Sequence, residues 1–264
     1  MKKYVLVPGA YGGMGRKTTE ALHNAGYTVF AMDRKTGEPK ENIIPIEADV
    51  TSEESVRAAF LKVRAHTEEL YAIVHFAGVY MLDSLFEMPT ESFERIFRVN
   101  LFGAFLVNKT FLPMLKRGSR ILITTSELAP LDPLPFTGVY AVTKAALDKY
   151  AYSLRMEAQL LGIPVSVLRA GAVATDMLGA STSALDKFCE STALYSCNAA
   201  RFKNIVESVE ARNIAPEKLA KKVLNILAKK NPRFAYSINR NPLLLMLNAL
   251  PKRTQLWAIK QVLK

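Results

Sequence analysis

The sequence contains few of the residues that build metal sites and disulfide frameworks. Its 264 residues include two cysteines, Cys189 and Cys197, and three histidines, His23, His66 and His75. The cysteines lie in a polar stretch without another ligand nearby, and the histidines are scattered along the chain. We therefore expect neither a structural metal nor a set of disulfides.

Long apolar runs are absent as well. The first apolar stretch, Tyr4–Val7, ends at Pro8 and Gly9 and is too short for the apolar region of a secretory signal. No uninterrupted apolar run approaches the length that crosses a bilayer. These absences predict a cytoplasmic protein.

Acidic side chains are nearly absent from the end of the chain. Residues 216–264 contain eleven Lys and Arg side chains and one acid, Glu217, and so carry +10 of the net charge of +11. The rest of the chain is almost neutral. The basic character therefore belongs to the tail and not to the whole protein.

Short runs rich in β-branched residues alternate with stretches of helical periodicity. This pattern predicts an α/β fold whose doubly wound parallel sheet, of Rossmann type, is the core of a single domain over residues 1–240. A basic helical extension, 241–264, follows it. The predicted strands are Tyr4–Val7, Thr28–Met32, Ile43–Glu47, Ala72–Phe76, Arg120–Thr125, Pro164–Arg169 and Phe234–Ile238. The predicted helices cover about residues 13–25, 53–66, 92–116, 139–161, 216–229 and 241–263.

The segment 178–213 fits neither pattern. It is rich in Ser, Ala and Asn and follows the predicted strand 164–169, at whose end an open α/β sheet forms its ligand crevice. We interpret it as a substrate loop or lid. The alternative is a pair of surface helices without a role.

A glycine-rich turn follows the first predicted strand and opens a helix. In this context such a turn binds phosphate, because the helix N-terminus presents free N–H groups. Gly9 permits the tight turn, Gly13 leaves room for a pyrophosphate, and Gly15 lets the helix pack on the strand. The alternative is an ordinary glycine turn.

Acidic residues follow the second and third strands. Asp33 lies about 20 residues beyond the glycine turn, where it can accept hydrogen bonds from an adenosine ribose, and it favours NAD. Arg34 comes next and can instead bind the 2′-phosphate of NADP, which stays the alternative. Asp49 either reaches the adenine or forms a turn before Thr51.

Tyr140 and Lys144 lie one helical turn apart, so their side chains share a helix face. A nearby cation lowers the pKa of a phenol, and such a pair can deliver a proton. The spacing alone also fits a solvated surface pair. Asn100, in the preceding helix, and Ser126, at the end of an apolar strand, favour the chemical interpretation.

Together these residues resemble the motifs of classical short-chain dehydrogenase/reductases over about residues 3–178. The turn from Gly9 to Gly15 resembles the family's TGxxxGxG motif, Ala77-Gly78 the end of its NNAG motif, and Gly171–Thr175 its PGxVxT segment. The residues that resemble its catalytic tetrad are Asn100, Ser126, Tyr140 and Lys144.

The resemblance implies hydride transfer between NAD(P) and a carbonyl. In the family's arrangement Tyr140 is the acid and base, Lys144 lowers its pKa and holds the nicotinamide ribose, Ser126 bonds the substrate oxygen, and Asn100 anchors a water. A homodimer or homotetramer built from the helices at 92–116 and 139–161 is also implied. The implied cofactor contacts are Gly9, Gly13, Met14, Gly15, Asp33, Arg34, Asp49, Val50, Ala77, Gly78, Tyr140, Lys144, Gly171, Val173 and Thr175.

The chain also departs from the family's pattern. Pro8 replaces a Thr, Ala170 replaces a Pro, and the spacing from Ser126 to Tyr140 is one residue longer than is common. His75 and Phe76 replace two Asn, and we expect His75 to stabilise the sheet. We expect Glu127, directly after Ser126, to face solvent.

The residues expected around the substrate are apolar and include no cation for a carboxylate or phosphate. They favour a lipophilic secondary alcohol or ketone, such as a hydroxysteroid, bile acid, retinoid or acyl derivative; the alternative is that they are core. The candidates are Leu128, Leu131, Leu134, Phe136, Met177, Leu178, Leu185 and Phe188.

The tail mixes aliphatic residues with cations and one Trp. An apolar face with a basic rim is typical of a helix at a membrane surface, and it resembles C-terminal extensions of family members that act on sterols and retinoids. The alternative is packing over the active-site mouth or a neighbouring subunit. Nucleic acid is disfavoured because aromatic stacking platforms are missing. The competing function is a catalytically silent scaffold that binds nucleotide or membrane.

Overall fold

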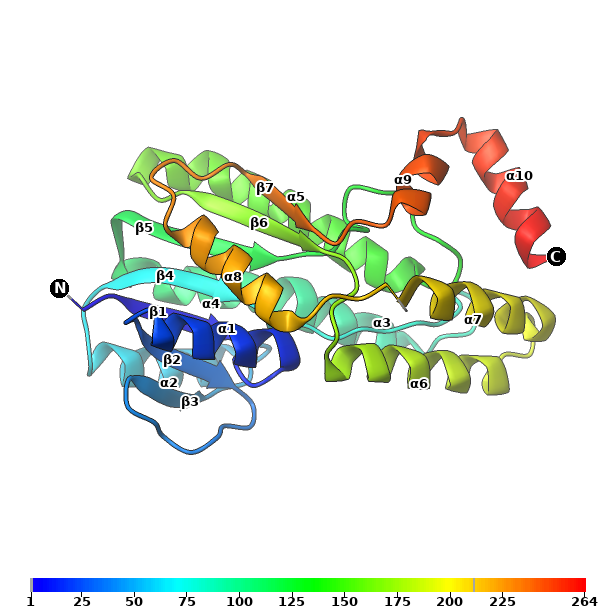
Figure 1. The fold of residues 1–264 in the computed structure, drawn as a ribbon. Helices are drawn as coiled ribbons and strands as arrows, with labels where there is room; N and C mark the ends of the chain where they lie inside the picture. Colours follow the sequence, from blue (N-terminus) through cyan, green and yellow to red (C-terminus); the bar gives the residue numbers. More distant parts are fainter. Residues whose placement is uncertain (1, 211) are drawn as a thin grey trace.

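Seven parallel strands form one sheet in the order β3-β2-β1-β4-β5-β6-β7 (Figure 1). The computed structural model describes residues 2–210 and 212–264, without the side chains of 176–182 and 207–210. The strands are β1 (Tyr4–Pro8), β2 (Thr28–Asp33), β3 (Ile43–Glu47), β4 (Leu70–His75), β5 (Leu115–Thr124), β6 (Val165–Ala170) and β7 (Ala235–Ile238). The predicted α/β fold and its seven strands are therefore confirmed, with the largest shift at the start of β5.

The central strands are buried on both faces of the sheet. In β1, Val5 and Val7 face one apolar cluster and Leu6 faces the other, and each is fully buried. Alternate residues of a strand point to opposite faces, so a parallel strand with a helix layer on each side is apolar throughout. This explains why the strands are continuous apolar runs in the sequence.

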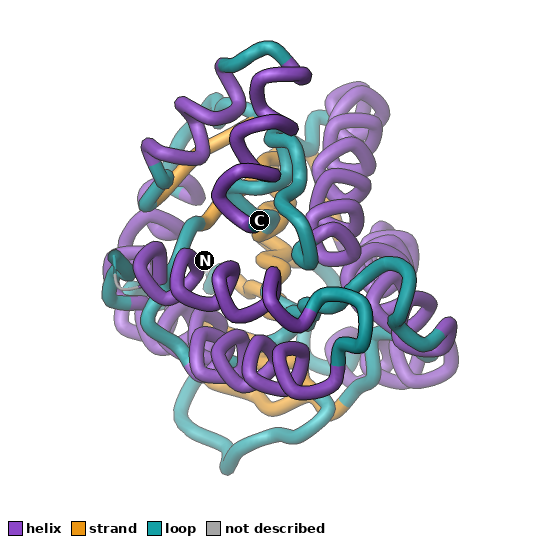
Figure 2. The backbone as a smooth tube through the Cα atoms, turned by 90° about the vertical axis from the view of Figure 1, so that its right-hand side faces the viewer, coloured by secondary structure: helices purple, strands orange, loops and turns teal. Residues whose placement is uncertain are grey.

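Helices cover both faces of the sheet. Figure 1 shows α1 and α8 in front of it and α2, α4 and α5 behind it; Figure 2 shows the same strands enclosed by helices from the side. The helices of these two layers are α1 (Gly13–Asn24), α8 (Pro216–Leu227), α2 (Glu53–Arg64), α4 (Gly103–Phe111) and α5 (Gly138–Ala158). The layers identify the doubly wound arrangement, with ligand sites expected at the carboxyl ends of the strands.

The helix predicted over 92–116 is interrupted. An α-helix, α3 (Thr90–Phe97), passes into a π-helical turn, Arg98–Phe102, before α4 begins, and residues 112–114 form a 3₁₀ turn that leads into β5. A π turn inserts an extra residue into the helical ladder and is common at functional sites. Asn100 lies inside this turn.

The segment 178–213 contains two helices beyond the strand ends, α6 (Asp176–Ser191) and α7 (Ser196–Glu210). Phe136 packs between them, with its ring centroid 4.6 Å from that of Phe188 and 5.4 Å from that of Phe202. The segment is thus a pair of helices, as the alternative interpretation predicted. Phe202 of this pair also lines a cavity. The segment is not a surface pair without contacts.

The tail forms two helices instead of one, α9 (Pro242–Ala249) and α10 (Lys252–Leu263). Pro251 separates them, since a proline lacks the N–H that would continue the helix. Gln255 and Leu263 of α10 are buried, and Asn198 of α7 donates a hydrogen bond to the Leu263 carbonyl. Within the described residues, no helix is both long and apolar enough to span a bilayer.

Candidate active site

The glycine turn after β1 is built by close backbone packing. Gly9 has a φ of 81°, a left-handed conformation that glycine adopts without strain. A Cβ on Gly15 would overlap the Gly9 carbonyl, and one on Gly13 would lie 2.5 Å from the Thr175 Cβ. The turn thus needs all three glycines, and Gly13 brings the segment around Thr175 against it.

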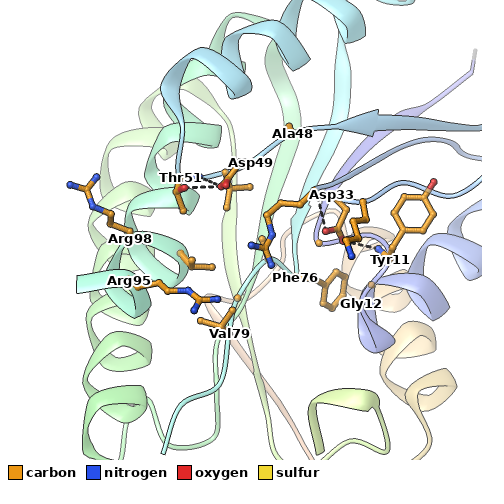
Figure 3. Close-up of a pocket in the computed structure, with 18 of the residues that line it drawn as sticks. Tyr11, Gly12, Asp33, Ala48, Asp49, Thr51, Phe76, Val79, Arg95 and Arg98 are labelled. Carbon is orange, nitrogen blue, oxygen red and sulfur yellow. Dashed lines mark hydrogen bonds between the residues drawn. The ribbon is translucent and has the colours of Figure 1, made fainter. Parts of the chain in front are cut away.

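A cleft of about 770 Å³ runs from this turn across the ends of β1 to β4. It contains most of the predicted cofactor contacts, and Figure 3 shows several of its residues around the opening. Those that line it are Gly9, Gly13, Met14, Gly15, Asp33, Arg34, Asp49, Val50, Ala77, Gly78 and Thr175.

Asp33 is held at the end of β2, facing the glycine turn. Its Oδ2 accepts a hydrogen bond from the Tyr11 N–H at 3.1 Å and its Oδ1 accepts one from the Arg34 N–H at 2.8 Å. Figure 3 shows Asp33 beside Tyr11 and Gly12. The carboxylate keeps free lone pairs for a ligand in the cleft.

Asp49 forms the turn that was the alternative to an adenine contact. Its Oδ1 accepts hydrogen bonds from the N–H and the hydroxyl of Thr51, at 2.8 and 2.7 Å (Figure 3). Burial opposes ionisation, but these bonds and the charge of Arg34 hold the pKa of Asp49 below its usual value. The residue lines the cleft with this turn in place.

Asn100 joins the loop after β4 to α5. Its Oδ1 accepts a hydrogen bond from the Val79 N–H at 2.8 Å, and its Nδ2 donates to the Val79 carbonyl and the Thr143 hydroxyl, each at 3.0 Å. Both amide donors are used, so the side chain fixes the loop firmly. A Cβ on Gly78 would lie 3.2 Å from Asn100 Oδ1 and 3.3 Å from Lys144 Nζ, which places both side chains around Gly78.

Ser126 and Tyr140 line a second cavity of about 190 Å³. Ser126 Oγ accepts a hydrogen bond from the Leu128 N–H at 3.2 Å, and the Tyr140 ring lies 4.9 Å from that of Tyr80, centroid to centroid. Gly171 and Val173 line the same cavity. Ser126 and Tyr140 thus share one cavity, whereas Lys144 and Asn100 line neither this cavity nor the cleft and lie together around Gly78.

The pKa of Tyr140 lies above its ordinary value, whereas the pairing with Lys144 predicted a value below it. Burial raises the pKa of Tyr140, the nearby Tyr80 raises it further, and the hydrogen bond with Ser126 offsets only part of this. Burial also lowers the pKa of Lys144 to about 8. The Lys144 Nζ lies 5.7 Å from the Tyr140 ring centroid, so desolvation outweighs the attraction between the two groups.

The cleft and the cavity meet at two residues. Met14, in the first turn of α1, and Thr175, after β6, line both. The cleft therefore adjoins the cavity that holds Ser126 and Tyr140. The glycine turn and the Ser126–Tyr140 pair, which were predicted from separate motifs, thus lie in adjacent parts of one site.

Several lining residues were not predicted. In the cleft they include Tyr11, Thr51, Arg95 and Arg98, of which Figure 3 shows Arg95 beside Val79. In the cavity they include Tyr80, Phe202, Ile205, Val206 and Leu244. Phe202, Ile205 and Val206 have the i, i+3, i+4 spacing of one helix face, so the sequence contained a signal for them.

Only some of the residues predicted to surround the substrate line the cavity. Leu128 and Leu134 line the cavity, whereas Leu185 and Phe188 are buried core with Phe136. Apolar side chains have the same pattern in core and cavity, so packing alone decides between them. Leu131 lines none of the described cavities. The side chains of Met177 and Leu178 lie outside the described residues.

Two departures from the family pattern are resolved. Glu127 does not face solvent: it is 8% exposed and lines the cavity, because its Oε2 accepts a hydrogen bond from the Asn241 N–H of the distant tail. His75 stabilises the sheet as predicted, with Nε2 2.8 Å from Asn108 Oδ1 on α4. Burial lowers the pKa of His75 to about 4, so it is neutral.

Comparisons with known proteins agree with this geometry. Mouse estradiol 17-beta-dehydrogenase 2 is 32% identical over 190 residues, which cover 67% of this chain and 50% of the relative. The aligned part thus spans about half of that relative's length. The 3-ketodihydrosphingosine reductase of Bacteroides thetaiotaomicron is 25% identical over 249 residues, covering 94% and 91%.

A solved structure has the same fold. A short chain dehydrogenase from Burkholderia cenocepacia in complex with NADP superposes with a TM-score of 0.72 at 20% identity, covering the whole of both chains. The profile of the short chain dehydrogenase family matches residues 3–186. On the evidence of this match and of the site that its motifs form, the chain belongs to the short-chain dehydrogenase family.

Proposed function

We propose that this protein is an NAD(P)-dependent oxidoreductase that interconverts a lipophilic secondary alcohol and its ketone. The observation that carries the proposal is the cavity that holds Ser126 and Tyr140 and joins the cleft at Met14 and Thr175. A proton donor, Tyr140, and a second hydrogen-bonding group, Ser126, thus line a cavity that adjoins a cleft of dinucleotide size.

The residues of the cavity divide the work of carbonyl reduction. Ser126 hydrogen-bonds the carbonyl oxygen, and the Tyr140 phenol donates a proton to it. Bound NAD(P) supplies the hydride. Because burial keeps Tyr140 protonated, it is in the form that donates. Lys144 is still a cation at neutral pH and stabilises the phenolate that remains.

The cleft fits a dinucleotide. Helix α1 has no side-chain cap and no acid in its first turn, so its N–H groups are free to bind a pyrophosphate. Asp33 is oriented toward this turn and accepts from a ribose hydroxyl, which favours NAD. Arg34 and Lys35 also line the cleft, and NADP is the alternative.

A lipophilic substrate is favoured by the cavity wall. Its apolar side chains come from five parts of the chain, and its polar ones include Ser126 and Tyr140. The two relatives compared above are named for a steroid and a sphingoid substrate. Hydroxysteroids and long-chain ketones are therefore the classes to test first.

The test is reduced-cofactor oxidation with a panel of ketosteroids and long-chain ketones, each with NADH and NADPH. Turnover of any member supports the proposal and excludes the silent scaffold. Binding of cofactor without turnover of any ketone or oxidation of any matching alcohol would support the scaffold instead.

We also infer contact with a membrane surface through the tail. On α9, Leu243 and Met246 are 59% and 68% exposed, and Leu250 continues the same face one turn later. On α10, Trp257 is 63% exposed and lies opposite the face that buries Gln255 and Leu263.

Cations flank this apolar surface. Arg253, Lys260 and Lys264 share the outer side of α10 with Trp257 by helical spacing, and all three are exposed. An exposed Trp with a cationic rim is suited to an anionic lipid surface. The tail is also bound to the body of the protein, since Lys252 pairs with Asp132.

Co-sedimentation with vesicles tests the contact. Vesicles that contain phosphatidylserine are expected to bind the protein at low salt and release it at high salt. Leu243→Asn with Trp257→Ala should weaken binding, and the control Leu160→Asn changes an exposed leucine on another surface. Unchanged binding of the double variant would refute the contact.

A homodimer or homotetramer is proposed for a different surface. Exposed apolar residues lie on the π turn, on the helical stretch after it, and on one side of α5. A helix–helix interface between subunits requires such a surface. They are Phe102, Phe105, Leu112, Val142, Tyr152 and Met156. Sedimentation velocity should give an oligomer that Phe105→Glu dissociates, and a monomeric wild type would refute it.

A further inference from the structure

Glu127 places a buried carboxyl group in the wall of the substrate cavity. It is one residue from Ser126 and 8% exposed. Among the described residues that line this cavity, it is the only acid, and none is a Lys, Arg or His. The site already described gives this group no role.

Backbone groups hold Glu127 in place, and none of them carries a charge that would neutralise its carboxylate. The Glu127 N–H donates to the Ala170 carbonyl at 2.9 Å, and Oε2 accepts from the Asn241 N–H at 2.6 Å. Oε1 lies over Gly171, where a Cβ would come within 2.9 Å of it. A carboxylate accepts up to about four hydrogen bonds, so acceptor sites remain.

The charge of Glu127 is poorly compensated within the protein. No described cation lies within ion-pair distance of it. Burial raises its pKa, and the Asn241 N–H and the charge of the exposed Arg240 offset this only in part. A buried carboxylate without a partner is unfavourable, and a cation from a ligand would relieve it.

We propose that Glu127 binds an ammonium group of the substrate, so that the preferred substrates are long-chain amino ketones and the matching amino alcohols. The ammonium group lies near the carbonyl carbon, because Glu127 and Ser126 line the same cavity, and the alkyl chain extends along the apolar wall. This deepens the proposed function, on which it rests, by naming the substrate class of the same cavity.

The alternative role of Glu127 is to anchor the tail at Asn241. The substitution Glu127→Gln separates the two roles, since a glutamine oxygen still accepts from the Asn241 N–H but has no charge. Glu127→Ala removes both the charge and the anchor. A selective effect of Glu127→Gln on cationic substrates therefore reports the charge alone.

The decisive experiment compares two ketones that differ at one position. One is a long-chain 3-ketone with an ammonium group at C2, and the other has hydrogen there. The wild type should prefer the amino ketone, and Glu127→Gln should lower kcat/KM for it about 10- to 100-fold while the plain ketone changes less than about twofold. Equal changes for both ketones, or none, would overturn the proposal.

A binding measurement separates this proposal from the proposed function. Without cofactor, a long-chain 2-amino alcohol should raise the Tm of the wild type and not that of Glu127→Gln. A shift of equal size in both proteins overturns the ammonium site. If the wild type reduces both ketones equally well, only the ammonium site falls, whereas reduction of neither ketone overturns the proposed function as well.

Discussion

The cofactor cleft and the substrate cavity meet at Met14 and Thr175 but are built in different ways. Most of the cleft follows the ends of neighbouring strands, so the sheet itself places its residues. The cavity receives side chains from segments as distant as Tyr80, Phe202 and Leu244. The cofactor half, which is the cleft, is therefore fixed by backbone geometry, and the substrate half, which is the cavity, by tertiary packing.

The two halves should therefore respond differently to substitution. Changes in the cleft should alter cofactor binding for every substrate, whereas changes in the cavity wall should alter substrate selection with cofactor binding intact. Groups at the junction, Met14 and Thr175, should affect both.

The largest effect is expected for Lys144→Met, which changes the residue one helical turn from Tyr140 on α5. Loss of the cation beside Tyr140 should lower kcat about 10²- to 10⁴-fold. The same change should stabilise the protein at pH 7, by at most roughly 3 kcal/mol, because burial lowers the pKa of Lys144 from 10.5 to about 8.

The size of this stabilisation depends on pH. Below pH 8 both the folded and the unfolded wild type carry the charge, so the full cost of burying it is present. Between pH 8 and 10.5 only the unfolded state keeps the proton, and the stability of the wild type rises toward that of the variant. Denaturant melts check this against the exposed control Lys149→Met, and a variant less stable than the wild type at pH 7 would contradict it.

The next effect concerns the pH dependence of stability and His75, at the end of β4 beside the cofactor cleft. The pKa of His75 falls from 6.5 to about 4 on burial, so the unfolded state binds a proton first as the pH drops. Stability should be lost between pH 6.5 and 4, by up to roughly 3 kcal/mol. His75→Asn should remove this loss and the exposed His66→Asn should not. Parallel pH profiles for the wild type and His75→Asn would refute the prediction.

This contrast between the halves also explains what the sequence could predict. The strands depend on local patterns, and their prediction is confirmed. The glycine turn also depends on a local pattern, and it lies between β1 and α1 as predicted. The π turn at Asn100 was missed because Asn100 bonds to Val79 and Thr143, which are 21 and 43 residues away in the sequence. Glu127 was misjudged because its partner, Asn241, is 114 residues away, and no local pattern reports such a contact.

A smaller effect is expected within the cleft. Asp33→Asn keeps an oxygen that can accept from the Tyr11 N–H but removes the charge that repels a 2′-phosphate. The ratio of the Kd values for NADPH and NADH should fall about five- to tenfold, whichever ketone is used. Fluorescence titration measures both constants, and an unchanged ratio would show that Asp33 does not select the cofactor.

The smallest effect separates the two sides of α9. Leu244 lines the cavity and Leu243 faces outward. Leu244→Ala should raise KM for a lipophilic ketone about fivefold, with cofactor Kd unchanged, since it removes apolar contact from one wall. Leu243→Ala is the matched control and should leave KM unchanged in a membrane-free assay. Equal KM values for the two variants would contradict this division.

We propose that Tyr140 delivers the proton to a carbonyl oxygen bound in the cavity that it shares with Ser126. Single-turnover reduction at saturating cofactor tests it most directly, with the cofactor Kd measured in parallel for the wild type and Tyr140→Phe. The account predicts a rate about 10³-fold lower with a Kd within about twofold of the wild type. A Tyr140→Phe rate within about tenfold of the wild type would contradict it.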